Sequence, residues 1–402
     1  MRKTKASRSK ASRCVVFDWI TPYSCHTLKS GHWNGPRNRR FMSTVFDCIT
    51  RTETCYKRST DSIFAHWNRS ARPSSDAARA LIEDWFARIP ITEQRELRSR
   101  FRCGFDAGLA AAFQELCLHE LFLRAGCKPT LHATLAGTAK QPDFLVQEAD
   151  GSELLLEAKS STDISSGPEN NPWRNRILDF LRGFKCDGFS LGVGEVTAGS
   201  SDLSQRLLRK HIREGLSTPV DGNPERILIP PLETDDGWKI RLTAFSDASF
   251  TNKSRCVLYE AWSRTWNGPT CALLNSLKKK GGRYGDGVSM PFVIAVNSFD
   301  PMLVDRDYEE PLLGERGFWG SSSAPQYRRV SAVLFTKNLW PETLLAGQVE
   351  SRLYLNPFAQ RPYNGILTKL DTFRFEGGSW QRYPGKAIHE LLQLRPQDSS
   401  SW

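Results

Sequence analysis

The spacing of hydrophobic positions changes along the chain from helical to strand-like, and the clearest series lies in residues 106–200. Apolar residues recur at helical spacing over 106–125, and Gly126 is a residue type that ends helices. Three short apolar runs, a second helical pattern and a further strand pattern follow at 128–133, 143–147, 153–159, 173–184 and 189–193. This order of helix, three strands, helix and strand predicts one compact mixed α/β layer.

The regions on either side of this series have other patterns. Residues 59–105 carry helical spacing: Ser75 and Asp76 can cap a helix that stops at Pro90, and a second helix is expected at 92–100. Beyond residue 200 the patterns predict one helix and three strands, at 203–213, 238–245, 291–298 and 329–335. The second half therefore forms either an α+β extension of the first sheet or a separate domain.

Four segments are expected, and most of the net positive charge lies at the start of the first. They are a basic, disordered leader at 1–58, a helical segment at 59–105, the α/β core at 106–200 and the C-terminal extension or second domain at 201–402. The first 40 residues hold ten Lys or Arg and one acid, against a net charge of +11 for the whole chain. Such a tail can bind nucleic acid through phosphate contacts. It can equally be a solvated leader, or upstream sequence that is not normally translated; a transit peptide fits less well.

Composition narrows the class of protein. The 402 residues are 39% hydrophobic and 25% charged, as in ordinary globular proteins. No apolar stretch in the sequence is long enough to span a bilayer, and residues 1–13 lack the apolar segment of a secretory signal. Ten cysteines without a CxxC pair are typical of free thiols in a reducing compartment. We therefore expect a cytoplasmic protein without a membrane partner. The residues that could hold zinc match no ligand spacing; they are Cys14, Cys25, His32, Cys48 and Cys55.

Candidate chemistry lies on two neighbouring strands. Glu157 and Lys159 are two residues apart, so their side chains share a face of the strand. Asp143 opens the preceding strand, and the hairpin register decides whether it joins them. A two-residue turn would place Asp143 opposite Ala158, on the other face. A three-residue loop with Gly151 in the left-handed conformation places Asp143 opposite Glu157, with Cβ atoms about 5 Å apart, and we adopt this register.

Two carboxylates beside a lysine suit a hard divalent cation and phosphoryl transfer. Mg²⁺, or Mn²⁺ in its place, takes oxygen ligands, usually one or two carboxylates with water and substrate phosphate. The metal acidifies an attacking water, and Lys159 can orient that water or neutralise the developing charge. The backbone carbonyl of Ala158 can complete the metal's shell. The alternative is a surface Glu–Lys pair with Asp143 as a turn residue, but both motifs fall in one hairpin, which favours the site.

Pro142-Asp143 and Glu157-Ala158-Lys159, on paired strands in this order of elements, resemble the PD-(D/E)xK nuclease superfamily. That group includes restriction-endonuclease-like enzymes and archaeal Holliday junction resolvases. The resemblance covers residues 106–200, about a quarter of the chain. It implies a restriction-endonuclease-like core with a mixed sheet and metal-dependent hydrolysis of phosphodiester bonds, and it does not imply a particular substrate.

The resemblance also implies an acidic residue on the helix before the strands, about three turns from the glycine that ends it. Glu115 stands eleven residues before Gly126 and fits, so it is the expected third acidic ligand. Its rival Glu120 has Arg124 four residues on, the favourable order for an exposed helical pair. The alternative for Glu115 is a partly exposed acid at the helix edge. Ser160 matches a small polar residue common in the resolvases, or it ends the strand.

Two basic segments are weaker candidates. The run KKKGGRYG, from Lys278 to Gly285, suits phosphates and equally suits a solvated loop, and it lacks the spacing of a nucleotide P-loop. The helix that carries Arg206 and Arg213 can follow a DNA backbone, although a charged outer face is the commoner meaning of such a pattern.

These patterns together predict a metal-dependent nuclease that acts on DNA. Asp143 and Glu157 would bind Mg²⁺, Glu115 would assist, and Lys159 would act on the water or the leaving charge. The alternative is a nucleic-acid-binding protein that keeps the fold without catalysis, and a third interpretation is an unrelated α/β protein with a chance motif. A nuclease that cuts both strands would need a homodimer or two subunits acting in turn.

Overall fold

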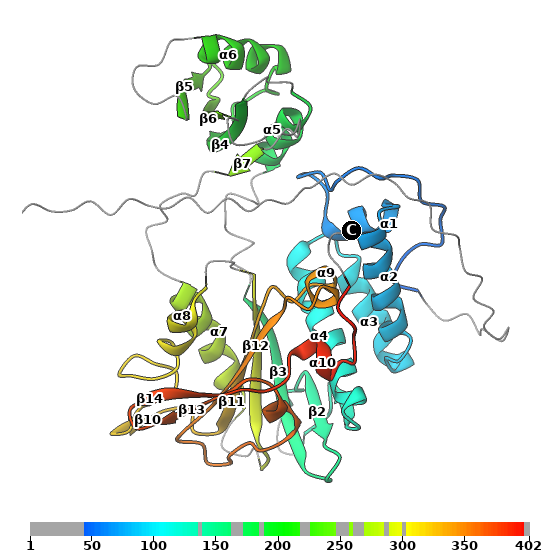
Figure 1. Ribbon diagram of the computed structural model, residues 1–402, viewed down its shortest axis with the longest axis vertical. Coiled ribbons are helices and arrows are strands. Elements are labelled where there is room, and N and C mark those ends of the chain that lie inside the picture. The colour runs from blue at the N-terminus through cyan, green and yellow to red at the C-terminus, as the bar shows by residue number, and fades with distance from the viewer. Residues whose placement is uncertain are drawn as a thin grey trace, which may run out of the picture. The chain divides into compact units, whose positions relative to one another are not determined.

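The structure is a computed structural model, shown in Figure 1, that describes most of the chain from residue 44 onward. The described ranges are 44–135, 139–161, 172–184, 189–217, 226–246, 257–259, 269–284, 289–299 and 303–397. Helices pack on a large mixed sheet, so the predicted α/β class is confirmed at this level.

Helices come first in the described chain. They are α1 (Ile63–Arg69), α2 (Pro73–Phe86), α3 (Ile91–Phe101) and α4 (Asp106–Arg124). α2 begins at Pro73 and not after the predicted cap at Ser75 and Asp76, because a proline's fixed φ and missing N–H suit the first helical position. α3 and α4 end within one residue of the limits that the hydrophobic pattern predicts.

The large sheet has eight strands, ordered β1-β2-β3-β8-β11-β12-β13-β14. Their bounds are β1 (Lys128–Leu131), β2 (Phe144–Gln147), β3 (Glu153–Ser161), β8 (Phe292–Ser298), β11 (Val330–Lys337), β12 (Glu350–Leu355), β13 (Thr372–Glu376) and β14 (Ser379–Tyr383). The pairs β3–β8, β8–β11 and β12–β13 are parallel, and the other pairs are antiparallel.

A second sheet, ordered β5-β6-β4-β7, has its own apolar core around Trp238. Its elements are α5 (Pro172–Arg182), β4 (Phe189–Thr197), α6 (Gln205–Ser217), β5 (Arg226–Glu233), β6 (Lys239–Ser246) and β7 (Val257–Tyr259). This corrects the expectation of a single layer over 106–200, because α5 and β4 belong to the second sheet.

The strand beside β3 in the large sheet is β8, which comes after α7 (Pro269–Gly281). Every residue of β8 is buried, and its run Phe-Val-Ile-Ala-Val suits a central strand covered on both faces. β4 contains Gly192 and Gly194, which leave little side-chain area to bury in such a position. The order helix, three strands, helix, strand thus recurs as α4, β1, β2, β3, α7 and β8, with residues 162–268 between β3 and α7.

α4 and α7 cover opposite faces of the large sheet (Figure 1). Leu154 and Leu156 of β3 lie in one core cluster with the apolar residues of α4. Leu155, between them, lies in a second cluster with Leu273 and Leu277 of α7. Side chains at odd positions of β3 therefore face α7, because successive residues of a strand point to opposite faces.

The start of the described chain corrects the predicted disordered leader. Val45 and Phe46 are buried, and their backbone N–H groups donate to the carboxylate of Glu83 at 3.1 and 2.7 Å. The described part of the predicted leader is therefore anchored on the helices at Val45 and Phe46, whereas 1–43 lie outside the described residues. The zinc candidates in that undescribed part are Cys14, Cys25 and His32.

Short elements complete the described chain. They are α8 (Asp305–Glu309), β9 (Gly320–Ser321), β10 (Ala324–Pro325), α9 (Pro341–Leu345), a 3₁₀ helix η4 (Ile366–Lys369) and α10 (Ile388–Leu391). Within the described ranges, none of the helices combines the length and the apolar character that crossing a membrane requires.

Candidate functional site

The hairpin of β2 and β3 has the predicted three-residue register. Phe144 pairs with Leu156, so the residues one step outward, Asp143 and Glu157, lie opposite each other on one face. The loop closes through the Glu148 N–H, which donates to the Ser152 carbonyl at 2.8 Å. Gly151 has a φ of 87°, the left-handed conformation that the loop requires and that glycine adopts without strain.

The carboxylates of Asp143 and Glu157 converge on one cation, the ammonium of Lys280. Lys280 Nζ donates to Asp143 Oδ2 at 2.8 Å and to Glu157 Oε2 at 2.5 Å. Asp143 Oδ2 also accepts a hydrogen bond from the Ala158 N–H at 2.7 Å, which fixes the carboxylate against the neighbouring strand. Two acids that are 14 positions apart in the sequence thus present oxygens to a single point in space.

Glu157 is fully buried and receives two further donors. Arg283 donates to Oε2 at 2.9 Å, and the Tyr284 hydroxyl donates to Oε1. Burial raises the pKa of Glu157, the charge of Asp143 adds to the rise, and the ammonium of Lys280 and the phenol oppose it. Burial and the hydrogen bond to Glu157 raise the pKa of Tyr284, which therefore keeps its proton.

Lys159 lies on the same face of β3 as Glu157 but is not part of this ion-pair cluster. Its side chain is half-buried and makes no hydrogen bond or ion pair with the described residues. Burial lowers the pKa of Lys159 from its ordinary value of 10.5, and the charges of Lys279 and Lys280 lower it further. Among the described residues the cation therefore has no counter-ion, which leaves it able to interact with an anion.

A groove of about 760 Å³ runs past these side chains. Among the described residues that line it are five cations and no acid. The cations are Lys140, Lys159, Lys279, Lys280 and Arg283. Small residues of the first turns of α4, Ala107, Gly108 and Ala111, form the opposite wall and leave room for a ligand between the helix and the lysines. The charge and size of the groove suit a polyanion.

Ala158 and Ser160 contribute in ways that the sequence did not indicate. The Ala158 N–H holds Asp143, whereas its carbonyl was the predicted metal ligand. Ser160 does not end the strand, since β3 continues to Ser161. Its hydroxyl donates to Gln114 of α4 at 3.0 Å, and Gln114 donates to the Ala295 carbonyl of β8 at 3.1 Å. This buried chain of hydrogen bonds ties α4 to the two central strands.

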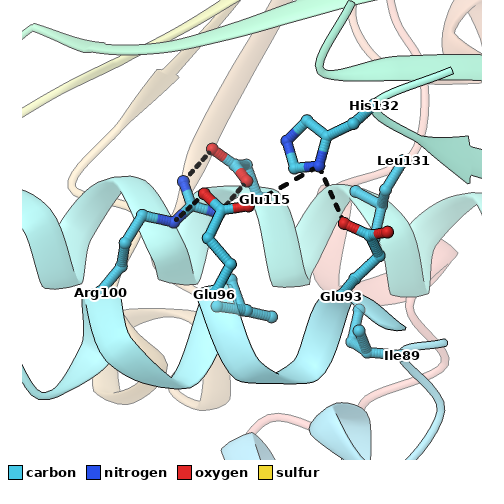
Figure 2. A pocket seen from close by; sticks show the side chains of 8 residues that line it. Ile89, Glu93, Glu96, Arg100, Glu115, Leu131 and His132 are labelled. Atoms are coloured by element: carbon cyan, nitrogen blue, oxygen red, sulfur yellow. Dashed lines mark hydrogen bonds and ion pairs between the residues drawn. The ribbon is translucent and has the colours of Figure 1, made fainter. Parts of the chain in front are cut away.

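Glu115 is paired with another residue and is not part of the described cluster of Asp143 and Glu157. Its carboxylate accepts two hydrogen bonds from the guanidinium of Arg100, at 2.6 and 2.5 Å (Figure 2). The rival Glu120 forms the predicted pair with Arg124, but it is buried and not exposed.

Figure 2 also shows a second group of ligand-type side chains beside Glu115. His132 follows β1, and its Nδ1 lies 3.0 Å from Oε2 of Glu93 and 3.8 Å from Oε2 of Glu96, both on α3. One ligand atom from each of the three lies within 4.8 Å of the others. In the described contacts this group links α3 to the end of β1. It is also a second group of side chains that could hold a metal ion.

Three residues of the site were not predicted as site residues: Lys280, Arg283 and Tyr284. All three belong to the basic run from Lys278 to Gly285, which the sequence had marked only as a weak phosphate-binding candidate. Its link to Glu157 depends on the pairing of β3 with β8, which brings the end of α7 to the hairpin.

Comparison with known proteins adds no relative to this description. No protein-family profile, curated protein or solved structure matches the chain.

Proposed function

We propose that this protein is a metal-dependent nuclease that hydrolyses phosphodiester bonds in DNA. The observation that carries the proposal is the convergence of Asp143 and Glu157 on one cation at a groove lined by five basic side chains. Carboxylates for a metal and cations for a phosphate backbone are the two charge patterns that phosphodiester hydrolysis needs together.

The donor set fits a hard divalent cation. Asp143 and Glu157 each place an oxygen within 2.8 Å of the same ammonium, so they can reach one ion at that position. Asp143 Oδ1 accepts no hydrogen bond from the described residues and would be a further oxygen ligand. A bound Mg²⁺ would acidify an attacking water and offset the negative charge of the transition state.

The chain's own cations have the complementary part. Lys159, without a protein counter-ion among the described residues, would hold the charge that develops on the attacked phosphate. Lys140 and Lys279 would bind neighbouring phosphates along the groove. The N-terminal end of α4, where Ala107 lines the opposite wall, would add partial positive charge there.

A plasmid-cleavage assay tests this proposal. The full chain is incubated with supercoiled plasmid and Mg²⁺ or Mn²⁺, and nicked and linear products are measured. We expect cleavage by the wild type, none with EDTA, and a loss of rate of about a hundredfold or more in Asp143→Asn and Lys159→Met. Glu153→Gln is the control, because Glu153 is exposed and lies on β3 with Lys159. Wild-type protein that cuts with neither ion, or an Asp143→Asn variant as fast as wild type, would end the proposal.

A second candidate function is binding of nucleic acid without cleavage. It is favoured by one observation: Lys280 and Arg283 already neutralise the two carboxylates. The same assay separates the two functions, because a binding protein would retard the plasmid in a gel with or without EDTA and leave it supercoiled.

A further inference from the structure

Lys280 stands where the two carboxylates direct their oxygens. It comes from the last turn of α7, far along the chain from the hairpin, and only 15% of its side chain is exposed. Its Nζ contacts Asp143 and Glu157 together, so one ammonium is the shared counter-ion of both acids. Lys280 also lines the basic groove.

An ammonium and a divalent cation cannot use these oxygens at the same time. A Mg²⁺ ion binds carboxylate oxygens at about 2.0–2.1 Å, whereas Nζ already lies 2.8 and 2.5 Å from one oxygen of each acid. A metal ion bound to both oxygens would therefore lie almost in contact with Nζ, and the two positive charges would repel each other strongly in this partly buried site. Binding of the metal requires Lys280 to leave.

One donor to Glu157 can stay. Tyr284 donates to Oε1, the oxygen that Lys280 does not contact, and it is 2% exposed. It keeps the carboxylate of Glu157 in place when Lys280 moves. The four-carbon stem of Lys280 is flexible and lies at the groove, so its ammonium can turn towards a ligand there without a change in the backbone.

We propose that Lys280 is an internal counter-ion that a divalent cation displaces from Asp143 and Glu157, and that the released ammonium then binds a phosphate of the substrate in the groove. The exchange keeps each charge paired in both states: the acids pass from ammonium to metal, and the ammonium passes from acids to phosphate. This proposal rests on the proposed function, because it names the regulation of that same metal site.

Metal affinity is the first measurement, since it does not depend on cleavage. Mn²⁺ binding to the full chain is followed by electron paramagnetic resonance and calorimetry. Lys280→Met removes the competing ammonium, and we expect Mn²⁺ to bind about tenfold more tightly or better. Lys278→Met, an exposed lysine on the same helix, is the matched control and leaves the affinity unchanged. All variants are repeated with His132→Ala, so that Mn²⁺ at the group of Glu93, Glu96 and His132 is not counted.

DNA affinity is the second measurement. A short labelled duplex is titrated with protein in EDTA and in Ca²⁺. Without metal, Lys280 is held by the acids and contacts no phosphate, so Lys280→Met weakens DNA binding only slightly, through the negative charge left on the acids. With Ca²⁺, the released ammonium contributes in the wild type only, and Lys280→Met binds several-fold more weakly. An equal loss in both conditions would overturn the exchange. Lys280→Gln gives a second neutral variant if Lys280→Met does not fold, as judged by circular dichroism.

The outcomes separate this inference from the proposed function. If Lys280→Met binds Mn²⁺ as wild type does, or more weakly, the displacement is wrong while the metal site stands. If Asp143→Asn and Glu157→Gln leave Mn²⁺ binding unchanged, both with His132 present and in the His132→Ala protein, then the acids hold no metal. In that case the metal-dependent nuclease proposal fails first, and the inference fails with it.

Discussion

At Glu157 a carboxylate with no exposed surface meets an ammonium, a guanidinium and a phenol. Each partner replaces a water that the buried carboxylate has lost, and Asp143 adds a second negative charge to the group. Two acids and two bases leave the cluster close to neutral. A buried ion pair of this kind adds little to the free energy of folding. Removal of one partner is strongly destabilising, because the other charges stay buried without compensation.

Removal of Glu157 should therefore lower stability more than removal of an exposed acid on the same strand. We expect Glu157→Ala to lower the free energy of unfolding by about 3 kcal/mol, because Lys280, Arg283 and Tyr284 lose their shared acceptor. Glu153→Ala, on the same strand but exposed, should change it by about 0.5 kcal/mol or less. Urea denaturation measures both, and equal effects would contradict the account of the cluster.

On α3 and at its C-cap, arginines line a second basic groove. Arg95, Arg98 and Arg102 recur at three- and four-residue spacing, and a groove of about 620 Å³ runs along them. Arg102 is held in an ion pair, whereas Arg95 and Arg98 make none with the described residues. Cys103 lines this groove, and Ala107 lines the groove of the site, so a few residues separate the two basic surfaces.

A bound strand should extend from the site onto this face of α3. We expect the double variant Arg95→Ala and Arg98→Ala to weaken DNA binding and to lower the slope of log affinity against log salt by about 1 to 2. The physical reason is that the variant makes fewer phosphate contacts, so fewer counter-ions are released from the DNA when it binds. Arg316→Ala, an exposed arginine that lines neither groove, is the control. A salt slope that does not change would restrict the binding surface to the groove of the site.

In the whole molecule, two sheets have separate apolar cores. Among the described residues, the core around Trp238 is made of residues from α5 to β6, and it falls in the chain between β3 and α7. The clusters of the large sheet draw on the chain before and after that segment. The second sheet is thus an insertion into the order of elements that builds the site.

The large sheet should fold without the insertion. We expect a chain in which residues 165–266 are replaced by a flexible Gly-Ser linker to unfold cooperatively and to keep the near-ultraviolet circular dichroism of packed aromatic residues, because neither of its apolar clusters loses a member. Thermal unfolding followed by calorimetry is the measurement. A shortened chain without a cooperative transition would show that the second sheet supports the first.

The sequence by itself determined the elements of the hairpin and its register. Side chains alternate along a strand, and Gly151 allows the left-handed residue of a three-residue loop, so Asp143 opposite Glu157 followed from local rules. The limits of α3 and α4 followed from helical spacing in the same way. These features depend on residues that are near one another in the chain.

Only the tertiary structure decided which distant segments complete the site. Several apolar runs could have paired with β3, and the structure pairs it with β8. A position covered on both faces favours the continuous apolar run of β8 over β4. The pairing of β3 with β8 places Lys280 beside the acids. The packing of α3 against α4 places Glu115 beside Arg100. A pattern along the chain records what each residue prefers, whereas the partner it meets depends on the packing of the whole sheet.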